Sequence, residues 1–195
     1  GLPRSIVLPS SPQRATVARR PPGMPHIMLF YSFFVFLTAS LFIGIGATAL
    51  FDLWGLARAK ATGQAPADWR MPGRWFSHAL RGRVFHDDIA AAAPVANEQG
   101  KGWLGHYAVG VLFAAGLLTF WGMGWAAAPT LGPALIVGIG TIALGWFLMS
   151  PGMGNGWAAS RSATPWRDRA HGLVAHAVFG LGLYLSALLW AALAG

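Results

Sequence analysis

Apolar and polar positions are separated into long blocks along this chain. Residues 21–51, 102–160 and 170–195 contain no Asp, Glu, Lys or Arg, and most of their side chains are apolar. An α-helix needs about 20 apolar residues to cross the hydrocarbon core of a membrane. The pattern predicts an all-α, polytopic membrane protein in which four transmembrane helices form a bundle, because the middle block has room for two.

Turn residues and charges set the expected boundaries. We expect membrane spans at about residues 27–51, 103–121, 133–149 and 171–193, with a polar loop over residues 53–101. Residues 1–23 are rich in Pro, Ser and Arg and have no helical period, which predicts a disordered tail. Residues 24–195 then form the membrane domain.

Composition excludes several classes of protein. Only 10% of the 195 residues are charged, against about 25% in soluble proteins. Cysteine is absent, so disulfides, thiolate metal sites and a cysteine nucleophile are excluded. No phosphate-binding loop or HExxH motif occurs. The net charge of +8 arises in loops and the tail, so we expect no nucleic-acid partner.

The basic residues predict an orientation in the membrane. Ten of them lie in the loops that join spans one and two and spans three and four: Arg58, Lys60, Arg70, Arg74, Arg81, Arg83, Lys101, Arg161, Arg167 and Arg169. Basic loops remain in the cytoplasm. Both loops are therefore expected to be cytoplasmic, although the four arginines of the tail oppose this orientation.

A faint internal repeat accompanies the spans. GIGATALFD at residues 44–52 resembles GIGTIALGW at residues 138–146, and His106 and His176 each precede a glycine by four positions. A duplicated helical hairpin would explain both similarities. Chance similarity between Gly- and Ala-rich helices would explain them as well.

Candidate chemistry lies at the inner ends of the spans. Thr48 and Asp52 belong to a weakly polar stripe in the first span, and His106 and His176 open the second and fourth. An ionisable group at membrane depth normally faces the bundle interior, so we expect Asp52 to contact at least one of these imidazoles. The histidines could be interface anchors, ligands of a divalent metal with a carboxylate, or the two axial ligands of a haem.

A second, weaker candidate lies in the loop. His86, Asp87 and Asp88 are consecutive and could bind a divalent cation. Adjacent residues on a helix point in different directions. Neutralisation of Arg81 and Arg83 is the alternative role for this cluster.

One resemblance extends over about residues 40–193. The motifs GIGATALFDLW, GRW, HDDIAAAAPV, GWLGHYAVG, PTLGPALIVG, PGMGNGWAASR and AHAVFGLGLYL resemble, in order and spacing, the bacterial membrane family catalogued as domain of unknown function 2938. The resemblance implies a multi-pass protein of the bacterial inner membrane. It implies no activity, cofactor or catalytic residue.

Three functional hypotheses follow. The first is an inner-membrane protein that acts by binding a partner subunit, a lipid or a small ligand. The partner subunit would be a second copy of this chain or another membrane protein. The second is a metal- or haem-binding redox protein or enzyme that uses Asp52, His106 and His176. The third is a small transporter, which with four spans would have to act as a dimer.

Overall fold

The protein is all-helical. The structure is a computed structural model that describes residues 24–194, and the side chains from Met28 onward. Four helices in it are long and apolar enough to cross a membrane, at Met28–Thr62, Glu98–Trp121, Leu131–Gly152 and Pro165–Ala194. The predicted all-α bundle of four spans is therefore confirmed. The expected disordered tail, residues 1–23, lies outside the described residues.

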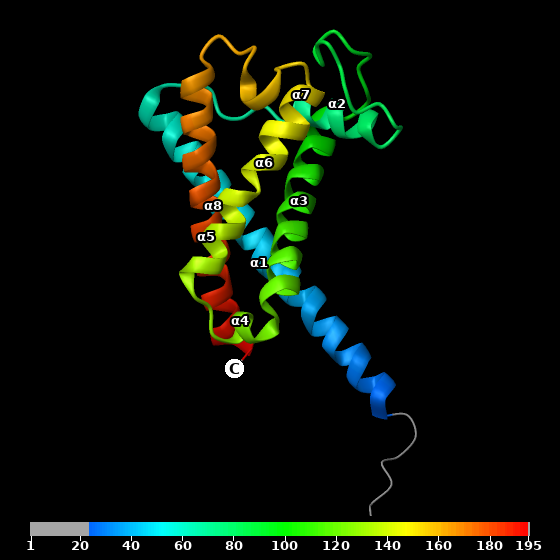
Figure 1. Cartoon of the computed structure of the whole chain (residues 1–195), viewed down its shortest axis with the longest axis vertical. Helices are drawn as coiled ribbons and strands as arrows, with labels where there is room; N and C mark the ends of the chain where they lie inside the picture. Colours follow the sequence, from blue (N-terminus) through cyan, green and yellow to red (C-terminus); the bar gives the residue numbers. More distant parts are fainter. Residues whose placement is uncertain (1–23, 195) are drawn as a thin grey trace, which may run out of the picture.

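The helices run up and down, and their longer connections lie at one end (Figure 1). In chain order they are α1 (Met24–Thr62), α2 (Arg70–Ala79), α3 (Glu98–Trp121), α4 (Met123–Ala127), α5 (Leu131–Gly140), α6 (Ile142–Leu144), the π-helix η1 (Gly145–Met149), α7 (Ser150–Gly152), the 3₁₀-helix η2 (Trp157–Ala159) and α8 (Pro165–Ala194). We call the end that carries residues 63–97 and 153–164 the capped end. The short α4 turn lies at the opposite end (Figure 1).

The helices extend beyond the expected membrane spans at two places. The first helix continues past Asp52, where the expected span ends, to Thr62, because LWGLARAKA contains good helix formers and no proline. It ends at Gly63, whose φ of +68° suits glycine. The expected loop over residues 53–101 also contains α2 and the start of α3, where the Asn97 side chain accepts a hydrogen bond from the Gly100 N–H at 3.2 Å.

The third span is a single rod with a local distortion. Its backbone passes from α5 through α6 into η1, where five residues adopt π-helical geometry before α7. Single π-turns are rare and occur often at functional sites. This widened turn lies near the capped end of the bundle (Figure 1).

Glycines bring the helices together in two matching pairs. A Cβ on Gly44 of α1 would lie 2.5 Å from the Val111 Cα in α3, and a Cβ on Gly138 of α5 would overlap the Gly180 Cα in α8. Small residues allow such close approach of membrane helices. Gly44 and Gly138 each open a GIG segment, and both contacts are close, so α1 with α3 and α5 with α8 form two similarly packed hairpins.

The two hairpins meet along one edge. There α1 packs extensively on α8, and a Cβ on Gly46 would lie 2.5 Å from the Ser186 Oγ. Ile43 and Leu183 are fully buried in the same core. On the other side α3 scarcely touches α6 or η1, which leaves space between the hairpins.

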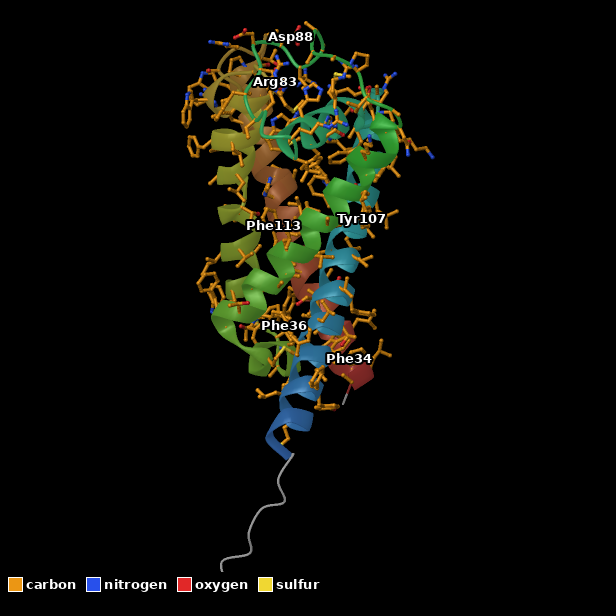
Figure 2. All side chains as sticks on the ribbon, turned by 90° about the vertical axis from the view of Figure 1, so that its right-hand side faces the viewer. Phe34, Phe36, Arg83, Asp88, Tyr107 and Phe113 are labelled. Carbon is orange, nitrogen blue, oxygen red and sulfur yellow. The ribbon has the colours of Figure 1, made fainter. Side chains whose placement is uncertain are left out.

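Arg74 of α2 organises the capped end. Its Nε and Nη2 donate to the Glu98 carboxylate at 2.6 and 3.2 Å, and its Nη1 donates to the carbonyls of Ile89, Ala90 and Ala92 at 2.8–3.1 Å. The hydrogen bonds with Glu98 raise the pKa of Arg74 above its ordinary value, so it remains a cation. Figure 2 shows charged side chains gathered at this end, with Arg83 and Asp88 among them.

Candidate functional site: an aromatic cavity between the hairpins

A partly open cavity of about 330 Å³ lies where the two hairpins separate. Its walls are apolar, and six aromatic side chains contribute to them: Phe51, Trp69, Trp75, Phe76, Phe113 and Phe179. Polar atoms come from Thr48, His106, Thr141 and His176. Cavities of this composition bind small molecules whose orientation is set by a few polar groups.

The first hairpin holds His106 in a fixed position. Its Nε2 lies 3.0 Å from Asp52 Oδ1, and the Tyr107 hydroxyl donates to Asp52 Oδ2, also at 3.0 Å. Trp69 stacks on the His106 ring with 3.9 Å between centroids. The His106 and Asp52 side chains are both mostly buried, with 15% of each exposed. The expected contact between Asp52 and a histidine is thus present in the structure.

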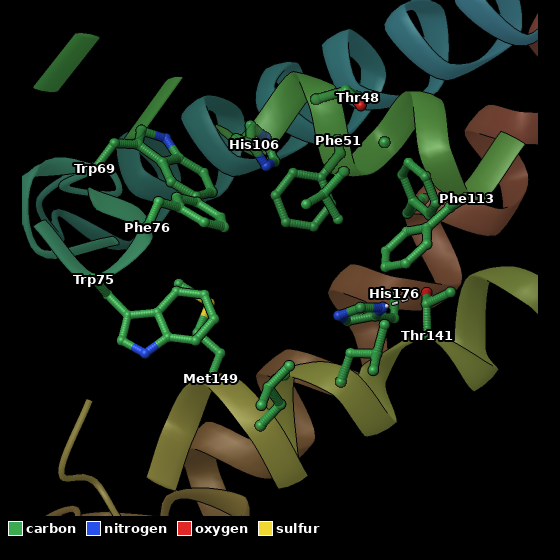
Figure 3. Close-up of a pocket in the computed structure, with 16 residues that line it drawn as sticks. Thr48, Phe51, Trp69, Trp75, Phe76, His106, Phe113, Thr141, Met149 and His176 are labelled. Atoms are coloured by element: carbon green, nitrogen blue, oxygen red, sulfur yellow. Dashed lines mark hydrogen bonds between the residues drawn. The ribbon is translucent and has the colours of Figure 1, made fainter. Parts of the chain in front are cut away.

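The second hairpin holds His176 differently. Its Nδ1 lies 3.0 Å from the Gly138 carbonyl oxygen and 3.2 Å from Thr141 Oγ1. A carbonyl oxygen can only accept a hydrogen bond, so Nδ1 carries the proton and Nε2 of the neutral ring is an acceptor. Figure 3 shows the His176 ring pointing into the cavity. In the alignment of GIGATALFD with GIGTIALGW, Trp146 stands at the position of Asp52, so His176 has no carboxylate at the corresponding place.

Thr48 lies deep in the wall formed by α1. It is 1% exposed and donates to the Gly44 carbonyl at 2.8 Å. Thr141 donates to the Gly138 carbonyl over the same distance in the second hairpin. The predicted polar stripe therefore reaches the cavity at Thr48, and Asp52 stands behind His106 without lining the cavity.

The π-helix η1 forms one side of the cavity. Gly145, Leu148 and Met149 line it together with Leu144. A Cβ added to Gly145 would meet no atom within 4 Å. The absence of a side chain at Gly145 therefore leaves room that a ligand can use.

Sequence reasoning did not identify the part that α2 plays. Trp75 and Phe76 of α2 extend over the capped end of the cavity (Figure 3), and Trp75 Nε1 donates to the Val84 carbonyl at 2.8 Å. The available signal was the four-residue spacing of Phe76 and Leu80. However, α2 ends at Ala79 and Leu80 is 90% exposed, so of these two side chains only Phe76 faces the protein.

The weaker cation site expected in the loop is not assembled. His86 is buried, and its two ring nitrogens contact His78 and the Gly152 carbonyl. Asp87 and Asp88 are exposed. Across residues 24–194, no three His, Asp or Glu side chains are grouped so that they could hold a metal ion.

Comparison with known proteins identifies the family. Residues 41–190 match the family described as "Protein of unknown function (DUF2938)". No curated protein and no solved structure matches the chain. The matched segment includes Asp52, His106, η1 and His176, and every residue that lines the cavity. Since the match covers most of its length, the chain belongs to the DUF2938 family.

Proposed function

We propose that this protein binds a small, largely apolar molecule with a flat ring in the cavity between its hairpins. The observation that carries the proposal is the combination of six aromatic side chains with one inward-facing acceptor, His176 Nε2. Aromatic rings stack on flat apolar molecules. A ligand that carries a hydroxyl or N–H group would donate to His176.

We further propose that the capped end faces the cytoplasm of a bacterial cell and that the spans lie in its inner membrane. The basic residues of the capped end support this orientation. Access to the cavity from the membrane would suit a lipid-soluble ligand, because the α3 and η1 sides of the cavity scarcely touch.

The binding test uses 2-naphthol as the probe and naphthalene as its matched control. Both have two fused rings, and only 2-naphthol has a hydroxyl donor. Equilibrium dialysis against the full chain in lipid nanodiscs, corrected with empty nanodiscs, should show saturable binding of 2-naphthol. Purely proportional partitioning of both compounds, equal to that of empty nanodiscs, would refute the proposal.

Two variants locate the binding. Gly145→Phe places a ring in the open space beside η1 and should weaken 2-naphthol binding about tenfold or more, because the ring occupies the ligand volume. Gly140→Phe is the matched control, since Gly140 is also unobstructed but does not line the cavity. Equal effects of the two substitutions would place the binding elsewhere.

The haem hypothesis is the main rival, because His106 and His176 line the same cavity. However, Nε2 of His106 contacts Asp52, which leaves only Nδ1 for a ligand. A Soret band in the absorption spectrum of the purified protein would favour haem and contradict the proposal.

A further inference from the structure

Two more histidines face each other in the cap, away from the cavity lining. His78 lies in the last turn of α2 and His86 in the loop that follows. Both are buried, with 6% and 7% exposed. His78 Nδ1 and His86 Nε2 are 2.9 Å apart, which is the length of a hydrogen bond.

The outer nitrogen of each ring contacts a backbone carbonyl. His78 Nε2 lies 3.0 Å from the Ala93 oxygen, and His86 Nδ1 lies 2.9 Å from the Gly152 oxygen. A carbonyl oxygen accepts hydrogen bonds and never donates them. Both outer nitrogens must therefore carry a proton.

Those two protons are all that a neutral pair possesses, because a neutral imidazole carries one N–H. The facing nitrogens of a neutral pair would then oppose two lone pairs at 2.9 Å, which is repulsive. A third proton converts this contact into an N–H···N hydrogen bond. We infer that His78 and His86 form a proton-binding site, which holds one additional proton between the rings and carries a single positive charge.

The short distance favours a proton over a metal ion. Two imidazoles that bind Zn²⁺ at about 2.0–2.1 Å in a tetrahedral site hold their nitrogens about 3.4 Å apart. No further His, Asp or Glu side chain completes a three-residue ligand set within the described part of the chain. The geometry thus matches a shared proton.

The surroundings accommodate a positive charge. His78 lies at the C-terminal end of α2, where the helix dipole favours a cation. Arg74 on the same helix is paired with Glu98 of α3. Asp87 and Asp88 follow His86 directly, whereas η1 and α7 contain no ionisable side chain.

The shared proton joins three segments of the capped end. It connects α2 to the loop at His86, and His86 binds Gly152 through both its ring and its backbone N–H, which donates at 3.0 Å. Gly152 belongs to α7, which directly follows η1. Because α2 also contributes Trp75 and Phe76 to the cavity, the proton helps to fix the cover of the cavity to the second hairpin.

The sign of the pH dependence follows from the proton count. An ordinary histidine loses its proton at about pH 6.5. Above that pH the unfolded pair holds two protons and the folded pair holds three, so unfolding releases a proton. The contribution of this site to stability should decrease from pH 7 to pH 9, by at most about a tenfold change in the folding constant per pH unit.

The test compares unfolding midpoints of the full chain in detergent between pH 7 and pH 9. In His86→Gln, the neutral amide can donate to Nδ1 of a neutral His78, so the third proton is no longer needed. We expect a shallower pH dependence than in the wild type. His171→Gln, at an exposed histidine of α8, should keep the wild-type dependence. Equal dependences for wild type and His86→Gln would overturn the proposal.

A second measurement requires no variant. In wild-type protein with ¹⁵N-labelled histidine at pH 8, NMR should show three protonated ring nitrogens for the pair. Two protonated nitrogens would overturn the proposal. So would a stoichiometric metal ion whose removal by a chelator abolishes the pH dependence. Neither result depends on whether the aromatic cavity binds a ligand.

Discussion

At the scale of single residues, Arg74 connects more of the cap than any other side chain described above. Its guanidinium binds Glu98 and three carbonyls of one loop. Lysine has the same charge but lacks the planar fork that makes these bonds together. The loop conformation that buries His86 therefore depends on the shape of the arginine side chain as well as on its charge.

We predict that Arg74→Lys lowers the unfolding midpoint of the detergent-purified protein by several degrees, because Glu98 and the loop carbonyls lose partners. Arg70→Lys is the control on the same helix. Arg70 forms an exposed pair with Asp68, with side chains 64% and 49% exposed, and such pairs contribute little. A similar shift in both variants would mean that the Arg74 contacts are unimportant.

One contact between candidate residues could be expected from their positions in the sequence. Asp52 and His106 begin or end apolar blocks at the same membrane depth, so their contact could be expected. The contact between His78 and His86 could not be predicted, because it depends on the path of an irregular loop. That path is set by the Arg74 contacts and by Gly82, whose φ is +84°.

At the scale of helices, close packing of α5 on α8 depends on Gly138. A Cβ there would overlap the Gly180 Cα, and backbone cannot move aside as a flexible side chain can. We predict that Gly138→Ala destabilises the protein by about 1–3 kcal/mol, measured by unfolding in mixed detergent micelles.

Gly140→Ala tests the same substitution two residues later in α5. A Cβ at Gly140 meets no atom within 4 Å. Alanine also favours helix over glycine, so this variant should be as stable as the wild type or slightly more stable. If both variants behaved alike, helix contact would not explain the requirement for glycine at position 138.

Helix boundaries were less predictable than helix number. Apolar blocks define where a chain can lie in lipid, but a helix continues beyond such a block wherever its residues favour it, as α1 does beyond Asp52. The π-turn η1 also had no sequence signal that we recognised. Its geometry depends on packing within the third span, which periodicity alone does not describe.

At the scale of the whole molecule, the orientation in the membrane can be tested directly. The C-terminal end of α8 lies opposite the capped end (Figure 1). If the capped end is cytoplasmic, a periplasm-dependent reporter fused to the C-terminus should be active and a cytoplasm-dependent reporter should be inactive. A reporter inserted in the exposed turn at Gly82 should show the reverse pattern. Opposite results at both positions would reverse the proposed orientation.

The number of spans and the all-helical class followed from the charge-free blocks alone, because lipid excludes charge strongly. The cavity did not follow from them. It exists because α3 and η1 stay apart while α1 and α8 pack closely, and such unequal spacing depends on side chains from several distant segments.

The unequal packing of the two hairpins has a mechanical consequence. At Gly46 and Ser186, and likewise at Gly182 and Ala47, α1 and α8 lie so close that a rotation of one hairpin against the other would have this edge as its axis. A small rotation of one hairpin about that axis would hardly change the α1–α8 distance, and it would change the α3–η1 distance most. The α3–η1 separation is therefore the distance through which the cavity volume would change with least disturbance of the α1–α8 contacts, and the contacts of His86 with Gly152 in the cap would limit that change.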